Sequence, residues 1–248
     1  MTSLQTSPRM LDENLLDQLF RFDGAFLRGT CRLGSGVEGR GLIEFRDPRT
    51  CTELLSQYAR YYPAAPRAAL VSQWSMDLIC VVLALPLAAA AQNLCCTPRD
   101  PHVALEDGMP VAQVFATCEV LPLNDPLALA QPLLMQDVAP LVQALASAGR
   151  VAQRLLWNNV AAAINVALDY FQVPHAPRWR DRLFRERHWA DGTRNPLYGF
   201  LQLAPGPSGA PLLMRKVCCL HHQLGEGRPY CDNCPLATGV GSTPLHQA

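Results

Sequence analysis

The sequence predicts an α+β fold that is mainly helical, with a small antiparallel sheet in the N-terminal half. Helical periodicity dominates the second half, β-branched residues cluster between His102 and Val120, and a cysteine-rich loop lies near the C-terminus. The 248 residues are 49% hydrophobic, which is enough for a substantial core. The length allows one large domain or two small ones.

The first third of the chain alternates short helices with irregular segments. Asp12 is a suitable N-cap for an amphipathic helix, and Pro63 ends a later helical stretch. We expect helices over Asp12–Phe22, Thr50–Tyr62 and Pro66 to about Gln92, with loops or short strands over the Gly-rich Phe26–Phe45. The longest apolar run, Leu78–Ala91, is shorter than the roughly 20 residues that span a bilayer. It therefore predicts a buried helix kinked at Pro86, and no transmembrane segment.

The middle and the second half of the chain carry the sheet and the longer helices. Asp107-Gly108 between β-prone runs predicts a hairpin within His102–Val120. Leu156, Val160, Ile164, Leu168 and Phe171 recur on one helix face. Helices are predicted over Leu133–Ser147 (ending at Gly149), Arg150–Phe171 and Arg178–Trp189, followed by a Pro/Gly-rich linker over Pro205–Pro211.

This pattern suggests three parts: an α+β domain over residues 1–204, a cysteine-rich segment over 212–236 and a flexible tail over 237–248. The cysteine-rich segment is too short to bury a core of its own. We expect this segment to fold around a bound metal and to dock onto the helices.

Cysteines near the C-terminus form the most informative motif, Cys218-Cys219-x11-Cys231-x2-Cys234. Adjacent Cα atoms lie about 3.8 Å apart, below the roughly 4.4 Å that a relaxed disulfide needs. Residues 1–9 show no charged region followed by an apolar core, so we expect no secretory signal and reduced thiols. Clustered cysteines in such a protein more often bind metal. An iron–sulfur cluster is favoured over structural zinc, because zinc ribbons usually pair two CxxC knuckles.

The motif resembles the signature of the FhuF-type ferric siderophore reductase family. Other matching residues occur in the expected order, namely Ser72-Gln73-Trp74-Ser75, Leu156-Trp157-Asn158-Asn159, Asn195-Pro196-Leu197, Arg215-Lys216-Val217 and Cys234-Pro235-Leu236. The loop after Cys219 is one residue longer than in that pattern, and Gly225 and Gly227 make the insertion sterically tolerable.

The resemblance implies a cytoplasmic oxidoreductase in which Cys218, Cys219, Cys231 and Cys234 hold a [2Fe–2S] cluster. Its substrate would be a ferric siderophore of the hydroxamate type, reduced by one electron to release Fe(II). Peripheral association with the inner membrane stays open. The alternative is a helical binding module with a structural four-cysteine zinc site and no redox activity. No phosphate-binding loop is present, so relatedness to siderophore synthetases carries little weight.

Other candidate residues are less specific. Cys95-Cys96 supplies only two ligands, and Cys31, Cys51, Cys80 and Cys118 are predicted to be structural. His221-His222 lies within the cysteine loop, where an imidazole could donate a hydrogen bond to a sulfur. The asparagine pair of the Trp157 motif is unfavourable inside a helix unless it bonds another segment.

Charge limits the choice of partner. Lys+Arg and Asp+Glu both number 21, so the net charge of zero gives no support to nucleic-acid binding. Arginines at positions 178, 180, 182, 185 and 187 alternate with Trp179 and Trp189. They predict either a solvated helix face or a docking face for a ferredoxin-like or flavodoxin-like electron donor.

Overall fold

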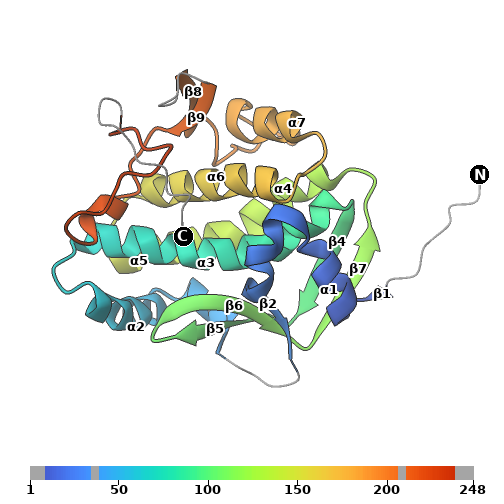
Figure 1. Cartoon of the computed structure of the whole chain (residues 1–248), viewed down its shortest axis with the longest axis horizontal. Helices are drawn as coiled ribbons and strands as arrows, with labels where there is room; N and C mark the ends of the chain where they lie inside the picture. The colour runs from blue at the N-terminus through green and yellow to red at the C-terminus, as the bar shows by residue number, and fades with distance from the viewer. Residues whose placement is uncertain (1–8, 35–38, 206–210, 238–248) are drawn as a thin grey trace, which may run out of the picture.

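Two long helices form the centre of the protein, which a computed structural model describes over residues 9–34, 39–205 and 211–237. In Figure 1, α3 (Arg67–Ala91) and α6 (Gln153–Tyr170) lie side by side, with β5 and β6 on one side and β8 and β9 on the other. The predicted mainly helical α+β class is confirmed. The predicted tail lies almost wholly outside the described residues.

The helices follow the sequence pattern closely. Asp12 caps α1, accepting a hydrogen bond from the Leu15 amide at 2.7 Å. The remaining α-helices are α1 (Glu13–Leu19), α2 (Pro48–Tyr58), α4 (Ala130–Pro132), α5 (Ala139–Gly149) and α7 (Ala176–Arg180). The 3₁₀ and π segments are η1 (Phe22–Thr30), η2 (Leu42–Arg46), η3 (Ala59–Tyr61), η4 (Pro126–Leu129), η5 (Leu133–Val138), η6 (Asp181–Arg185) and η7 (His221–Gln223).

Strands form two small sheets and a separate hairpin. The sheet orders are β1-β7-β4 and β2-β6-β5-β3, and β8 pairs with β9. All pairings are antiparallel except β2 with β6, which is parallel. Their bounds are β1 (Arg9–Met10), β2 (Cys31–Leu33), β3 (Arg40–Gly41), β4 (Leu94–Arg99), β5 (His102–Glu106), β6 (Met109–Phe115), β7 (Thr117–Pro122), β8 (Leu201–Pro205) and β9 (Pro211–Arg215).

The predicted hairpin forms around Asp107-Gly108, where both residues have positive φ. A side chain at Gly108 would place its Cβ only 2.7 Å from the Gln57 Cβ. The turn therefore needs glycine for two reasons, the positive φ and the lack of space for a side chain. The Gly108 carbonyl accepts a hydrogen bond from the Trp74 indole at 2.7 Å. Trp74 is fully buried and stacks on Phe45, so this tryptophan packs in the core.

α3 is the core helix. It is long and apolar enough to cross a membrane by length and composition, but most of its side chains are buried against other elements. Pro86 lies inside it, and the helix continues to Ala91. Burial on this scale fits the centre of a folded domain. Cys31, Cys51 and Cys118 are buried in the same core, as predicted for structural cysteines.

Three predicted segments differ from the structure. The Gly-rich Phe26–Phe45, expected as loops or short strands, also holds the end of η1 and most of η2, both 3₁₀ segments. The helix expected over Arg178–Trp189 ends at Arg185, because the Asn195 side-chain amide donates to the carbonyls of Arg182, Leu183 and Glu186. These bonds satisfy carbonyls that further helical turns would otherwise use. The Pro205–Pro211 stretch joins paired strands: Leu201–Pro205 is hydrogen-bonded to Pro211–Arg215, so the residues on both sides belong to one hairpin.

Candidate metal centre

The structure brings the four predicted cysteines together as two pairs. The Cys218 and Cys234 sulfurs lie 3.8 Å apart, and the Cys219 and Cys231 sulfurs lie 3.3 Å apart. The first thiol of the motif therefore faces the last, and the second faces the third. All four cysteines are free, and Cys219 and Cys234 are buried.

Local backbone turns aim these side chains at one another. Leu220 adopts a left-handed conformation (φ 64°), and its amide donates to the Cys218 sulfur at 3.3 Å. The Cys234 amide donates to the Cys231 carbonyl at 2.9 Å, which closes the CxxC turn. Both turns are set by residues inside the motif, so the loop positions its own sulfurs.

α3 and α6 hold the loop in place. The Ser72 hydroxyl and the Gln73 amide both donate to the Cys219 carbonyl, each at 2.7 Å. From α6, Asn158 donates to the Val217 carbonyl at 2.9 Å and accepts from the Val217 amide at 3.3 Å. The mid-helix asparagine is thus compensated by hydrogen bonds to another segment, as the sequence suggested.

Asn159 connects both helices to the strand that leads into the thiols. Its amide donates to the Ser72 hydroxyl at 2.9 Å and to the Ser75 hydroxyl at 3.1 Å, and its carbonyl accepts from the Arg215 guanidinium at 2.8 Å. The Arg215 amide donates to the Asn233 carbonyl at 3.0 Å, inside the CxxC turn. Asn159 and Arg215 are both buried, so this network fixes β9 against the helices.

Electrostatics at the site favour negative charge on one sulfur, that of Cys219. Hydrogen bonds from Cys218 and Cys231, together with the positive charge of Arg215, lower the pKa of Cys219. Hydrogen bonding to Cys219 and burial raise the pKa of Cys218 and of Cys231. Arg215 is 2% exposed, and its Nε has no hydrogen-bond partner among the described residues. A buried cation of this kind is stabilised by a nearby anion.

Histidine lies beside one sulfur pair. His222 Nδ1 is 3.7 Å from the Cys218 sulfur, and its ring lies 5.0 Å from that of Tyr230. His221 Nε2 is 3.2 Å from an Arg228 nitrogen. His222 is therefore the imidazole that is placed to influence the thiols.

The donor set fits a centre with two metal ions. Two sulfurs on one tetrahedral metal ion, with bonds of about 2.3 Å, lie about 3.8 Å apart. The Cys218 and Cys234 sulfurs have that spacing, and the Cys219 and Cys231 sulfurs lie closer, at 3.3 Å. In the ranges that the structure describes, no group of three His, Cys, Asp or Glu side chains is arranged to hold a single metal ion. Two thiol pairs would allow two irons to be held by two cysteines each.

Comparison with known families agrees with this chemistry. Residues 72–208 match the family described as "Ferric iron reductase FhuF-like transporter", and residues 215–236 match the "FhuF 2Fe-2S C-terminal domain". The chain belongs to the FhuF-like ferric iron reductase family. It is also 27% identical over 212 residues to the "Ferric siderophore reductase" of Escherichia coli (strain K12), covering 79% of this chain and 78% of that protein.

Membership of the FhuF-like family gives the chain its cofactor, a [2Fe–2S] cluster in the C-terminal segment, and ferric iron reduction as its activity. The match covers both the helices that hold the cysteine loop and the loop itself. The assignment of the individual cysteines as cluster ligands stays a prediction, which the pairing of their sulfurs supports.

The second cysteine pair of this FhuF-like protein lies in a different environment. Cys95 and Cys96 are on β4, where the pKa of Cys96 is raised by a hydrogen bond to Cys118 and by burial. Cys118 is on the neighbouring strand β7. Cys96 thus belongs to a thiol contact between strands β4 and β7.

The arginine run is largely neutralised by nearby carboxylates. Arg178 pairs with Asp125 at 3.4 Å, Arg180 with Asp169 at 2.6 Å and Arg185 with Asp181 at 3.0 Å. Arg182 pairs with Glu186 and lies 5.5 Å from the Trp189 ring centre. This pairing favours a structural role over a strongly basic docking face.

Two residues at the site were not identified as functional from sequence. In the sequence, Arg215 belongs to the family motif Arg215-Lys216-Val217, and nothing marks Asn233. Arg215 ends the otherwise apolar strand Pro211–Arg215 and precedes Lys216, so the available signal was a basic pair at the end of an apolar run. Asn233 contributes a backbone carbonyl, which residue type alone does not reveal.

Proposed function

We propose that this protein is a one-electron reductase of ferric hydroxamate siderophores, in which Cys218, Cys219, Cys231 and Cys234 hold the [2Fe–2S] cluster. The observation that supports this most strongly is the convergence of the four thiols into two close pairs. Family membership and the named relative support ferric siderophore reduction. The hydroxamate class and the one-electron route are part of the proposal.

The residues of the chain supply position and electrostatics for this chemistry. Ser72, Gln73 and Asn158 hold the loop, and Arg215 places a positive charge close to the sulfurs. When bound, the cluster supplies one-electron transfer. Fe(III) prefers hard oxygen donors, so its reduction loosens the chelate and favours release of Fe(II).

The electron source and the location are also proposals. A ferredoxin-like or flavodoxin-like protein is a suitable one-electron donor, although the ion pairs along the arginine run weaken the case for docking there. We place the protein in the cytoplasm, where thiols stay reduced. Peripheral association with the inner membrane is the alternative location, which cell fractionation would test.

Anaerobic purification tests the proposal directly. We expect iron and acid-labile sulfide in equal amounts, and visible absorption that dithionite bleaches. The reduced protein should then convert a ferric hydroxamate to Fe(II), measured with an Fe(II)-trapping chelator. A colourless protein that contains zinc would instead identify the four-cysteine binding module and overturn the reductase.

A further inference from the structure

A cavity of about 340 Å³ lies between η1, α3, α6 and the cysteine segment. Three residues of that segment line it, Arg215, Cys231 and Asn233. Cys231 is one of the four clustered thiols, so the cavity adjoins the predicted cluster. Any molecule bound there would be separated from the predicted cluster by little more than the Cys231 side chain. Electron transfer is fastest over such short distances.

The rest of the lining is strongly apolar. α3 contributes Leu83 and α6 contributes Val166 and Tyr170, along with several alanines. Phe26 and Val166 are 64% and 41% exposed, so the cavity reaches the surface where η1 faces α6. The Phe26 and Tyr170 rings meet edge to face, 5.0 Å apart, across this entrance. Exposed apolar side chains around a cavity are typical of a ligand site.

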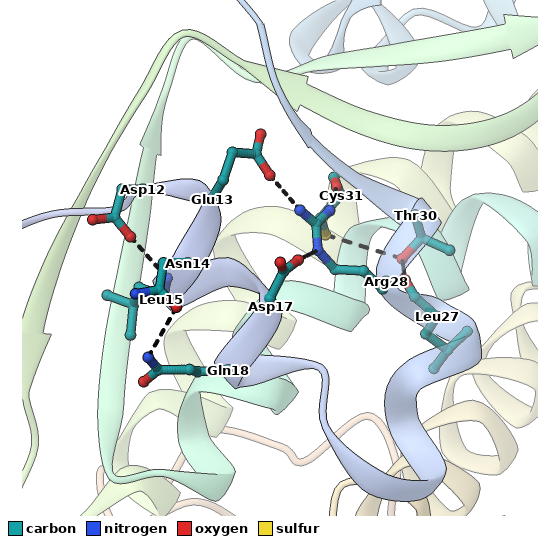
Figure 2. A network of polar contacts seen from close by, with 10 residues as sticks. All are labelled: Asp12, Glu13, Asn14, Leu15, Asp17, Gln18, Leu27, Arg28, Thr30 and Cys31. Atoms are coloured by element: carbon teal, nitrogen blue, oxygen red, sulfur yellow. Dashed lines mark hydrogen bonds and ion pairs between the residues drawn. The ribbon is translucent and has the colours of Figure 1, made fainter.

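The entrance wall is held by ionic contacts. Figure 2 shows the Arg28 guanidinium between Glu13 and Asp17 of α1. Arg28 also donates to the Cys31 carbonyl at 2.8 Å, where η1 passes into β2. Because Arg28 belongs to η1, these contacts fix the segment that carries Phe26. The wall is therefore formed before any ligand arrives.

Arg215 is the one charged residue among the described residues that line the cavity. Its side-chain hydrogen-bond partners, Asn159 and Met76, are neutral, and its charge acts on Cys219 and Cys231. Because Arg215 lines the cavity and also acts on two of the thiols, it connects the cavity electrostatically to the sulfur site.

We propose that this cavity is where the ferric chelate docks. This inference rests on the proposed reductase function and adds the place: the chelate would lie against the apolar walls of α3 and α6, beside Cys231.

The redox step balances with a single external donor. A one-electron reductant gives one electron to the protein, and that electron passes near Cys231 to the Fe(III) of the docked chelate. Fe(III) becomes Fe(II), the donor is oxidised by one electron, and no covalent bond to the protein forms. The weakened Fe(II) complex then dissociates, and its hydroxamate oxygens can take up protons from water.

Gallium chelates test the docking site separately from the reaction, because Ga(III) matches the charge of Fe(III) but is not reduced. We expect the anaerobically purified wild-type holoprotein to bind a gallium tris-hydroxamate. Val166→Trp should raise the Kd at least tenfold by filling the entrance, and the gentler Val166→Leu should raise it less. Visible absorption and its bleaching by dithionite should stay unchanged in both variants.

Met135→Trp is the matched control, since Met135 is 40% exposed on η5, away from the cavity lining. Equal Kd values for Val166→Trp and Met135→Trp would overturn the docking site. If the gallium hydroxamate binds at the cavity but the ferric one is not reduced, the docking inference stands and the proposed reductase function fails.

Discussion

The Arg215 guanidinium donates to the Asn159 carbonyl oxygen at 2.8 Å, and both side chains are buried. This bond joins the strand that enters the cysteine segment to the middle of α6. The amide end of Asn159 continues the network to Ser72 and Ser75 of α3. One asparagine therefore connects both central helices with a positive charge that acts on Cys219 and Cys231.

Loss of Asn159 should destabilise the protein. Asn159→Leu removes the carbonyl that accepts from the Arg215 guanidinium and the amide that donates to the Ser72 and Ser75 hydroxyls, although both hydroxyls keep their own acceptors. A buried polar group that loses its partner costs about 1–3 kcal/mol. We expect the free energy of unfolding of the anaerobic holoprotein to fall by about 2–4 kcal/mol in urea titrations. Asn14→Leu, at an exposed position on α1, is the control and should change stability by less than about 0.5 kcal/mol.

Arg215 should set the reduction potential of the cluster. Reduction adds one negative charge, which a buried cation favours. A unit charge acting over roughly 8–16 Å at an effective dielectric constant of about 20 contributes about 1–2 kcal/mol. We therefore expect Arg215→Met to lower the midpoint potential by roughly 40–90 mV in a spectroscopic redox titration.

Arg215→Lys separates charge from packing in that experiment. Lysine keeps the positive charge but cannot reproduce the guanidinium geometry. Its midpoint potential should stay closer to wild type than that of the methionine variant. Equal shifts in the two variants would show that Arg215 acts through structure alone.

Each of the four clustered cysteines should be required for the cofactor. Serine oxygen is a harder and poorer iron ligand than thiolate. Replacement of Cys218, Cys219, Cys231 or Cys234 by serine should lower iron and sulfide content several-fold after anaerobic purification. Cys95→Ser, in the pair on β4, should retain both, and a fully loaded Cys219→Ser protein would contradict the ligand assignment.

Asp77 should make stability depend on pH. Burial raises the pKa of this carboxyl from 3.8 to about 6. The folded state therefore holds the proton more tightly than the unfolded state. Asp77 should stabilise the fold least at high pH, with stability falling as pH rises from about 4 to about 6 and level above that.

Asp77→Asn removes the titrating group at nearly constant shape. The variant should approach wild type near pH 4 and be more stable by about 1–3 kcal/mol at pH 7–8. The difference between the two unfolding free energies, measured across this range, cancels the other titrating groups. A difference that is independent of pH would refute the assignment to Asp77.

The sequence was sufficient for the long helices, the Asp107-Gly108 turn and the cysteine motif, because each depends on neighbouring residues. Pro66 and a long apolar run located α3, helical periodicity located α6, and the Cys-x-x-Cys spacing produces its own turn. The helix predicted to run through Trp189 ends at Arg185, because its end depends on a residue that is distant in the sequence. The Asn195 side-chain amide, in a later loop, donates hydrogen bonds to the carbonyls of Arg182, Leu183 and Glu186.

Local residue order thus determined which thiols this chain offers and which metal chemistry they suit. Tertiary structure alone decided that Arg215 lies buried beside them and that an apolar cavity opens next to Cys231. These features depend on contacts between residues more than 50 positions apart, such as Asn159 with Arg215 and Ser72 with Cys219. Packing of α3 against α6 brings those partners together, and no short stretch of sequence carries that information.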